Sequence, residues 1–157
     1  MIATQSKSSR TPQYISPSTL GVAVYVFIPP ATQPATPTAV ADFSAASPAC
    51  TAGSNGSRNC TITVPAPIGN NDTFVVSTYD QVPSGGQPHG NLLSTNTITG
   101  VVITAGSVNT VPFTLNGVPA TIVMNPPAVQ VPAGQPSSFT INVNAKDVDG
   151  NYIIGTG

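Results

Sequence analysis

The chain has 157 residues, of which four are Lys or Arg and five are Asp, so its formal net charge is −1. So few basic residues cannot form a basic surface for phosphate backbones or anionic lipids, which argues against nucleic-acid and membrane-surface partners. With 17 Pro and 14 Gly beside many Thr, Ser, Asn and Val, the composition favours strands joined by tight turns and disfavours helices.

The length suits one medium domain, or one domain with part of another. Residues 1–17 form a polar tail without an apolar signal core, so we expect that any export signal was removed or was never part of this sequence. The longest apolar run, residues 22–28, is far shorter than the roughly 20 residues of a membrane span, and we expect no membrane insertion. Low charge offset by Thr, Ser and Asn is typical of secreted repeats and surface fibres, so we expect an extracellular or cell-surface location.

The first predicted strand, residues 21–28, is apolar on both faces, which is expected for a strand in the middle of a sheet. One face consists of Val22, Val24, Val26 and Ile28, and the other of Ala23, Tyr25 and Phe27. A Pro-rich connection follows, and residues 38–43 form a second short predicted strand.

Cys50 and Cys60 bracket a polar loop, which indicates a disulfide and therefore an oxidising compartment. Such a bond restricts the unfolded chain by about 3 kcal/mol in the chain-entropy model. Two alternatives remain, free structural thiols and metal ligation. Metal binding would require two more soft ligands, and the chain offers no other Cys and one His, His89.

Four more strands are predicted up to residue 115 from alternating apolar residues: 60–64, 73–79, 92–99 with a continuation at 101–104, and 110–115. In the first, Cys60, Ile62 and Val64 are expected to face inward. In the last, Val111, Phe113 and Leu115 are expected inward, and Pro112 argues for an edge position.

Asn116 and Gly117 are a turn signal, so we place a boundary there, between a sandwich of residues 18–116 and a second unit of residues 117–157. The second unit contains predicted strands at 120–124, 138–144 and 152–154, with apolar side chains of the middle strand facing inward. About 40 residues cannot bury a sandwich core alone. Further chain, the first sandwich, or a strand from a neighbouring copy must complete it.

Two stretches resemble families of secreted bacterial modules. Residues 65–115 resemble carboxypeptidase-regulatory or transthyretin-like sandwich repeats in a Pro and Gly turn, an aromatic strand ending in Tyr79 and Asp80, and a later Thr-rich strand. The second stretch resembles the opening half of an invasin-type bacterial immunoglobulin-like domain, through Val131–Gly134, Phe139–Val143 and the residues Lys146, Asp147, Asp149, Gly150 and Asn151. Together the resemblances imply an antiparallel, immunoglobulin-like β-sandwich and transfer no catalytic residue.

Asp147, Asp149 and Asn151, with Gly150, resemble the first half of a calcium loop. The second half is absent, because no Glu follows, and an ordinary Asp-Gly β-turn explains the same residues. His89 lies in a loop rich in Gly and Pro without the Ser, Cys or carboxylate context of nucleophilic catalysis, so we assign no catalytic residue. We also expect no cofactor.

Glycosylation sequons begin at Asn55, Asn59 and Asn71. Few aromatic side chains fall outside predicted core positions, and a sugar-stacking platform would have to use Tyr14 or Tyr152.

The sequence therefore predicts a non-catalytic, extracellular structural or adhesive module. One alternative is a self-polymerising, pilus-like fibre subunit assembled by strand addition, and another is a carbohydrate-binding module. The expected partners are other protein modules, copies of the same chain, or glycans.

Overall fold

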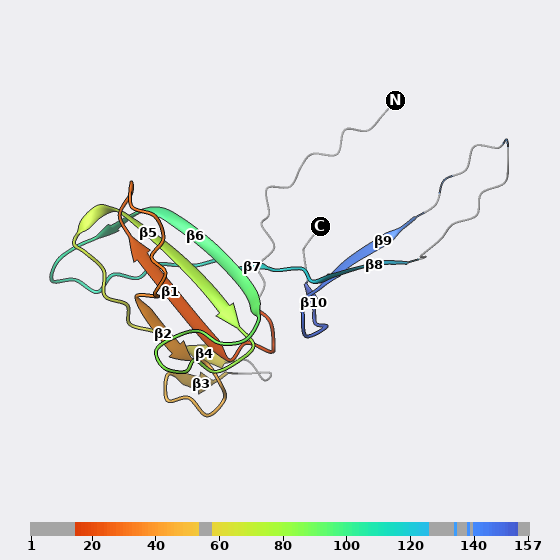
Figure 1. Ribbon diagram of the computed structural model, residues 1–157, viewed down its shortest axis with the longest axis horizontal. Coiled ribbons are helices and arrows are strands. Elements are labelled where there is room, and N and C mark those ends of the chain that lie inside the picture. The colour runs from red at the N-terminus through yellow and green to blue at the C-terminus, as the bar shows by residue number, and fades with distance from the viewer. Residues whose placement is uncertain (1–14, 54–57, 126–133, 135–137, 139, 154–157) are drawn as a thin grey trace.

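A computed structural model of the chain describes residues 15–53, 58–125, 134, 138 and 140–153. The secondary structure of these residues is all β, and every strand pairing is antiparallel (Figure 1), as predicted. Within this described part of the chain, no helix is long and apolar enough to cross a membrane.

The described residues contain ten strands in three sheets. The strands are β1 Gly21–Phe27, β2 Ala39–Asp42, β3 Cys50–Ala52, β4 Arg58–Cys60, β5 Gly69–Tyr79, β6 Leu92–Ile103, β7 Asn116–Gly117, β8 Thr121–Asn125, β9 Asn142–Lys146 and β10 Tyr152–Ile153. The largest sheet has the order β2-β1-β5-β6-β7, the second β10-β9-β8, and the third is the hairpin β3-β4.

β1 lies between β2 and β5, and it is apolar on both faces as its sequence predicts. One face carries the larger core cluster, in which Val22 and Val24 pack with Phe74 and Val76 of β5 and with Leu115. The opposite face carries a smaller cluster of Ala23, Tyr25 and Val75.

The layer over the larger cluster does not consist of the strands that the sequence predicts. Residues 61–64 and 110–115 are not strands, and β4 ends at Cys60. Their predicted facing is nevertheless correct, because Ile62, Val64, Val111, Phe113 and Leu115 all contribute to the core. Strand assignment needs backbone pairing as well as alternation, and Pro65, Pro67 and Pro112 each remove a backbone donor.

β6 is one continuous strand, so residues 101–103 continue the strand predicted at 92–99. Its register with β5 shifts by one residue between Val101 and Ile98, so β6 has an extra residue there. Gly100 lies in this bulge with φ of 70°, a conformation that glycine adopts without strain. The bulge bends the strand without ending its pairing.

β7 corrects the predicted turn at Asn116 and Gly117. These residues pair with Thr95 and Ser94 of β6, and the Val118 N–H donates to the Leu93 carbonyl (2.8 Å). The chain thus leaves the large sheet along the first half of β6, toward its Leu92 end.

The sheet β8-β9-β10 has its own pairing, with β8 and β9 joined over five residue pairs. Its apolar side chains are exposed, contrary to the inward facing that the sequence suggested: Ile141 and Val143 are both exposed, as are Ile122 and Met124. Phe139 and Ile154 lie outside the described residues. Among the described residues of this unit, alternation therefore does not produce a buried face within one chain.

Candidate functional site

Cys50 and Cys60 form a disulfide, which confirms the predicted pairing and is incompatible with free thiols or thiolate metal ligands. The two residues are direct cross-strand partners in the hairpin β3-β4. Arg58 ties this hairpin to the rest of the fold, because its guanidinium donates to the carbonyls of Phe43 (2.7 Å) and Thr19 (3.1 Å). The disulfide therefore stabilises a hairpin that is itself anchored to the main domain.

The outer edge of β6 is only partly covered by a neighbouring strand. β7 covers only Ser94 and Thr95 on that edge. The Asn96 side chain then bridges the gap, since its Nδ2 donates to the Thr114 carbonyl and its Oδ1 accepts the Thr97 N–H (2.7 Å). Beyond Asn96, no strand among the described residues pairs with this edge. Every second residue of an edge strand turns its N–H and C=O groups outward, so this stretch offers free pairing sites.

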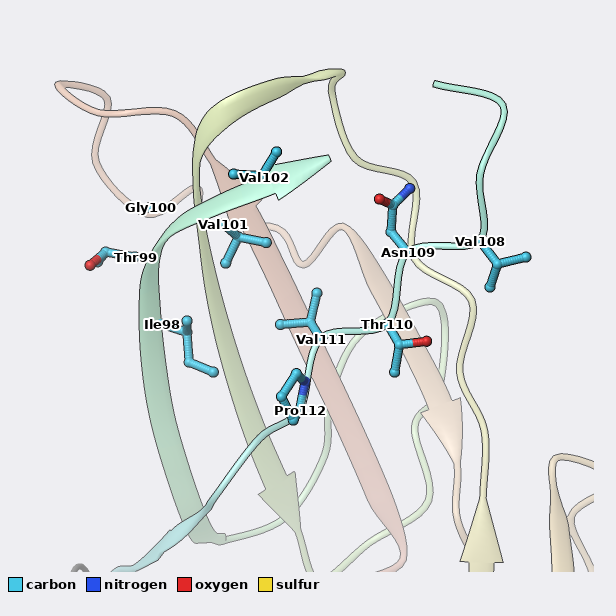
Figure 2. Close-up of a pocket in the computed structure, with 10 residues that line it drawn as sticks. All are labelled: Ile98, Thr99, Gly100, Val101, Val102, Val108, Asn109, Thr110, Val111 and Pro112. Atoms are coloured by element: carbon cyan, nitrogen blue, oxygen red, sulfur yellow. The ribbon is translucent and has the colours of Figure 1, made fainter. Parts of the chain in front are cut away.

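A groove of about 450 Å³ runs along this open edge (Figure 2). One wall is residues 98–102 of β6 and the other is the facing segment 108–112. Figure 2 shows Val101 and Val111 pointing toward one another between the two walls, whereas Val102 and Val108 lie at the rim and are largely exposed. No residue of either wall is charged.

Behind the segment 108–111 lies a larger, partly open cavity of about 880 Å³. Its walls are the apolar face of β1 and β5 on one side and the overlying segments on the other; they include Val24, Phe74, Val76, Ile62, Val111 and Phe113. Native interiors leave few voids larger than a water molecule. The layer over the sheet is thus loosely packed beside the open edge of β6.

The proposed calcium residues form a turn between β9 and β10. The Gly150 N–H donates to the Asp147 carbonyl (3.1 Å), and Gly150 has a φ of 81°. Asp147 Oδ1 accepts the backbone N–H groups of Asp149 (3.1 Å) and Asn151 (2.8 Å), and Asp147 Oδ2 accepts the Ser16 hydroxyl (2.6 Å). Protein donors thus occupy both oxygens of this buried carboxylate, which is the behaviour of an Asx turn.

The Asn151 amide extends the same network, donating to Asp147 and to the hydroxyls of Ser16 (3.2 Å) and Ser18 (3.0 Å). No group of three or more His, Cys, Asp or Glu residues positioned to hold a metal occurs in the described ranges. The network connects the second unit to the segment preceding β1.

The other residues singled out in the sequence do not converge on one place. His89 is exposed in the loop between β5 and β6. Asn59 on β4 and Asn71 on β5 are both exposed, as glycosylation would require, and Asn55 lies outside the described residues.

The tyrosines do not form an exposed aromatic strip. Tyr152 is exposed, but the Lys146 ammonium lies over its ring, 4.5 Å from the centroid. Tyr25 is buried, and Tyr79 beside it is half-buried; Tyr14 lies outside the described residues. Burial raises the pKa of the Tyr79 phenol, and the neighbouring Tyr25 raises it further through charge and a hydrogen bond, whereas a hydrogen bond with Ser77 lowers it.

Sequence reasoning missed one unusual group, Asp72 on β5. It is fully buried, and neither carboxylate oxygen has a hydrogen-bond partner in the described structure. An alternating strand pattern does not predict a buried carboxylate at Asp72, because an Asp next to Asn71 is typical of a turn. A buried carboxylate without partners lowers the stability of the fold.

Comparisons with protein-family models, with curated proteins and with solved structures found no match. The class that the structure itself defines is an all-β, disulfide-bonded protein with antiparallel sheets, consistent with a β-sandwich.

Proposed function

We propose that this chain is a non-catalytic structural or adhesive module of an extracellular or cell-surface protein, with an immunoglobulin-like or transthyretin-like sandwich as its main domain. The observation that carries the proposal is the Cys50–Cys60 disulfide, which joins cross-strand partners in a hairpin. Disulfides persist in oxidising compartments and are rare in the cytosol. A module of this kind supplies mechanical resistance, and it requires no reacting side chains.

The local packing supports this proposal. The side chain of Arg58 holds the disulfide hairpin on two backbone carbonyls, and the buried network around Asp147 holds the second unit. Both devices join segments distant in the chain, as expected of a unit that has to resist unfolding.

Two measurements on the native protein in its source cells test the proposal. Cells are lysed in acid and free thiols are alkylated, and we expect Cys50 and Cys60 to be recovered unalkylated. Intact cells are also treated with an external protease, and we expect the chain to be lost while a cytosolic marker remains. Recovery of alkylated cysteines would contradict an extracellular role. The same holds if the chain is fully protected from the protease and none of it is found in the medium.

A fibre subunit assembled by strand addition is the second candidate function. It is favoured by the open edge of β6 beyond Asn96 and by the exposed apolar strand β8 in the same chain. The carbohydrate-binding alternative has weaker support, because Lys146 covers one face of Tyr152.

A further inference from the structure

We propose that the open edge of β6 accepts strand β8 from a second copy of this chain, so that the large sheet continues from one molecule into the next. This inference rests on the fibre-subunit candidate and specifies its two contact surfaces. The acceptor is the β6 stretch 98–103 with the facing segment 108–112, and the donor is β8, Thr121–Asn125.

The acceptor has the chemistry of a site for an extended backbone. On its β6 wall, the outward N–H and C=O groups face no paired strand among the described residues, and the opposite wall stands far enough away to leave a groove of about 450 Å³. Pro112 in that opposite wall has no N–H to donate. An added strand pairs with β6 and places alternate side chains in the apolar groove, which is the β-augmentation mode of recognition.

The donor has matching properties. β8 pairs with β9 along one edge, and its other edge has no partner among the residues that the structure describes. Ile122 is 66% exposed and Met124 53% exposed, so the strand presents apolar side chains as well as a free edge. Five residues span about 17 Å, and the six residues of the open acceptor stretch span about 20 Å.

Charge supports pairing between these two edges. Natural edge strands are usually protected from association by charged side chains or proline. Neither β6 nor β8 contains a charged residue or a proline, and the groove wall 108–112 is also uncharged. The two strands thus join without desolvating a charge, and neither strand contains a charged residue or a proline that would oppose pairing.

The donor has to come from another molecule because of the direction of the chain. β7 pairs with Ser94 and Thr95, and Val118 follows toward Leu93, away from the open stretch 98–103. Figure 1 shows the sheet β8-β9-β10 beyond the opposite end of β6 from the loop that follows Ile103. Only three residues, 118–120, connect β7 to β8, about 10 Å of chain. β8 therefore cannot turn back to its own acceptor, about 20 Å away along β6.

The resulting contact is head-to-tail, because donor and acceptor are different surfaces at opposite ends of one molecule. Head-to-tail contacts give rings when the rotation closes and filaments when it does not. One five-residue strand covers much less than the roughly 1,600 Å² of a standard interface. We therefore expect weak, concentration-dependent assembly, with a dissociation constant per junction of roughly 10 to 100 μM.

Two variants with opposite blocked surfaces test the proposal. Val102→Lys places a charge at the rim of the acceptor, and Ile122→Lys places one on the donor; both side chains are exposed, so folding should be preserved. Val82→Lys, at an exposed valine in the loop between β5 and β6, is the matched control. Sedimentation velocity and electron microscopy of the full chain are performed from 10 to 500 μM, roughly spanning the expected range.

The wild type and Val82→Lys should form multimers, and each blocked variant should remain a monomer with an unchanged circular dichroism spectrum. An equimolar mixture of the two blocked variants should form dimers and nothing larger, because it contains one intact donor and one intact acceptor per pair. The proposed strand addition would be refuted if the wild type stays monomeric at 500 μM. It would also be refuted if the Val102→Lys variant still associates, by pairing of β8 in one copy with β8 in another. Neither result would affect the alkylation and protease-shaving test of the extracellular module.

Discussion

Ser16 and Asp147 lie 131 residues apart in the chain, yet the Ser16 hydroxyl donates to Asp147 Oδ2 at 2.6 Å and both side chains are buried. Ser16 precedes the first strand of the large sheet, whereas Asp147 begins the turn after β9. This hydrogen bond therefore helps to fix the small sheet relative to the large one. A hydrogen bond to a buried charged group contributes about 1.5 to 3 kcal/mol.

Asp147→Ala should lower the free energy of unfolding by about 3 kcal/mol, because it leaves the Ser16 hydroxyl and two backbone N–H groups without their acceptor. Ser16→Ala should cost about 1 to 2 kcal/mol. Asp149→Ala, at an exposed carboxylate two residues away, is the control and should stay within about 0.5 kcal/mol of wild type. Urea unfolding measures all three, and equal effects at 147 and 149 would show that the network adds nothing.

Calcium should leave the thermal midpoint unchanged, because protein donors already occupy both Asp147 oxygens. Differential scanning calorimetry in 5 mM calcium and in a chelator measures this midpoint. For a site with a dissociation constant of about 50 μM, 5 mM calcium is in about 100-fold excess and would stabilise the fold by about 2.7 kcal/mol. A calcium-dependent rise in the midpoint that disappears in Asp149→Ala would instead assign a cation to this turn.

Loss of the Cys50–Cys60 disulfide should destabilise the fold by about 2 to 3 kcal/mol. This is the value that the chain-entropy model gives for a bond between residues 10 positions apart. The double variant Cys50→Ser with Cys60→Ser avoids a leftover thiol. Its urea midpoint should fall without loss of the β-sheet circular dichroism signal. Reduced wild type is the matched control, and a midpoint equal to that of the oxidised protein would show that the hairpin needs no covalent closure.

Stability should fall as pH rises above 10, with part of the loss due to Tyr79. Its pKa is raised in the folded state, mainly by burial, so above pH 10 the unfolded chain releases the phenolic proton more readily than the folded one. The contribution is complete below the ordinary pKa of 10 and is lost as pH passes the raised value. Tyr79→Phe should reduce the loss between pH 9 and 11, measured by urea unfolding.

Asp72→Asn should raise the free energy of unfolding by about 1 to 3 kcal/mol, because an amide costs less to bury without a hydrogen-bond partner than an ionisable carboxyl group does. Asp80→Asn provides a contrast of opposite sign. Asp80 accepts the Asn91 backbone N–H (2.6 Å) and side-chain amide (2.7 Å), so this change should be destabilising by about 1 kcal/mol. A loss of stability in Asp72→Asn would mean that the Asp72 carboxylate is needed by a partner.

Much of the fold was predictable from period-two alternation. The pattern of residues 21–28 correctly placed β1 inside the sheet, and the alternation at 110–115 correctly oriented Val111 and Phe113 toward the core. The disulfide was also predictable, because two cysteines around a polar loop have few other roles. These features depend on local residue order, which determines which way each side chain points from an extended backbone.

Tertiary structure alone decided which extended segments become strands and which edges stay open. Strand pairing needs a second backbone about 4.8 Å away. Residues 62–64 and 110–115 alternate in the same way but pair with no strand of the described residues, whereas Asn116 and Gly117 do pair with β6. The candidate interaction site depends on this difference. The sequence by itself determined the facing of the apolar side chains, and the three-dimensional pairing of the backbone left the edge of β6 and the face of β8 exposed.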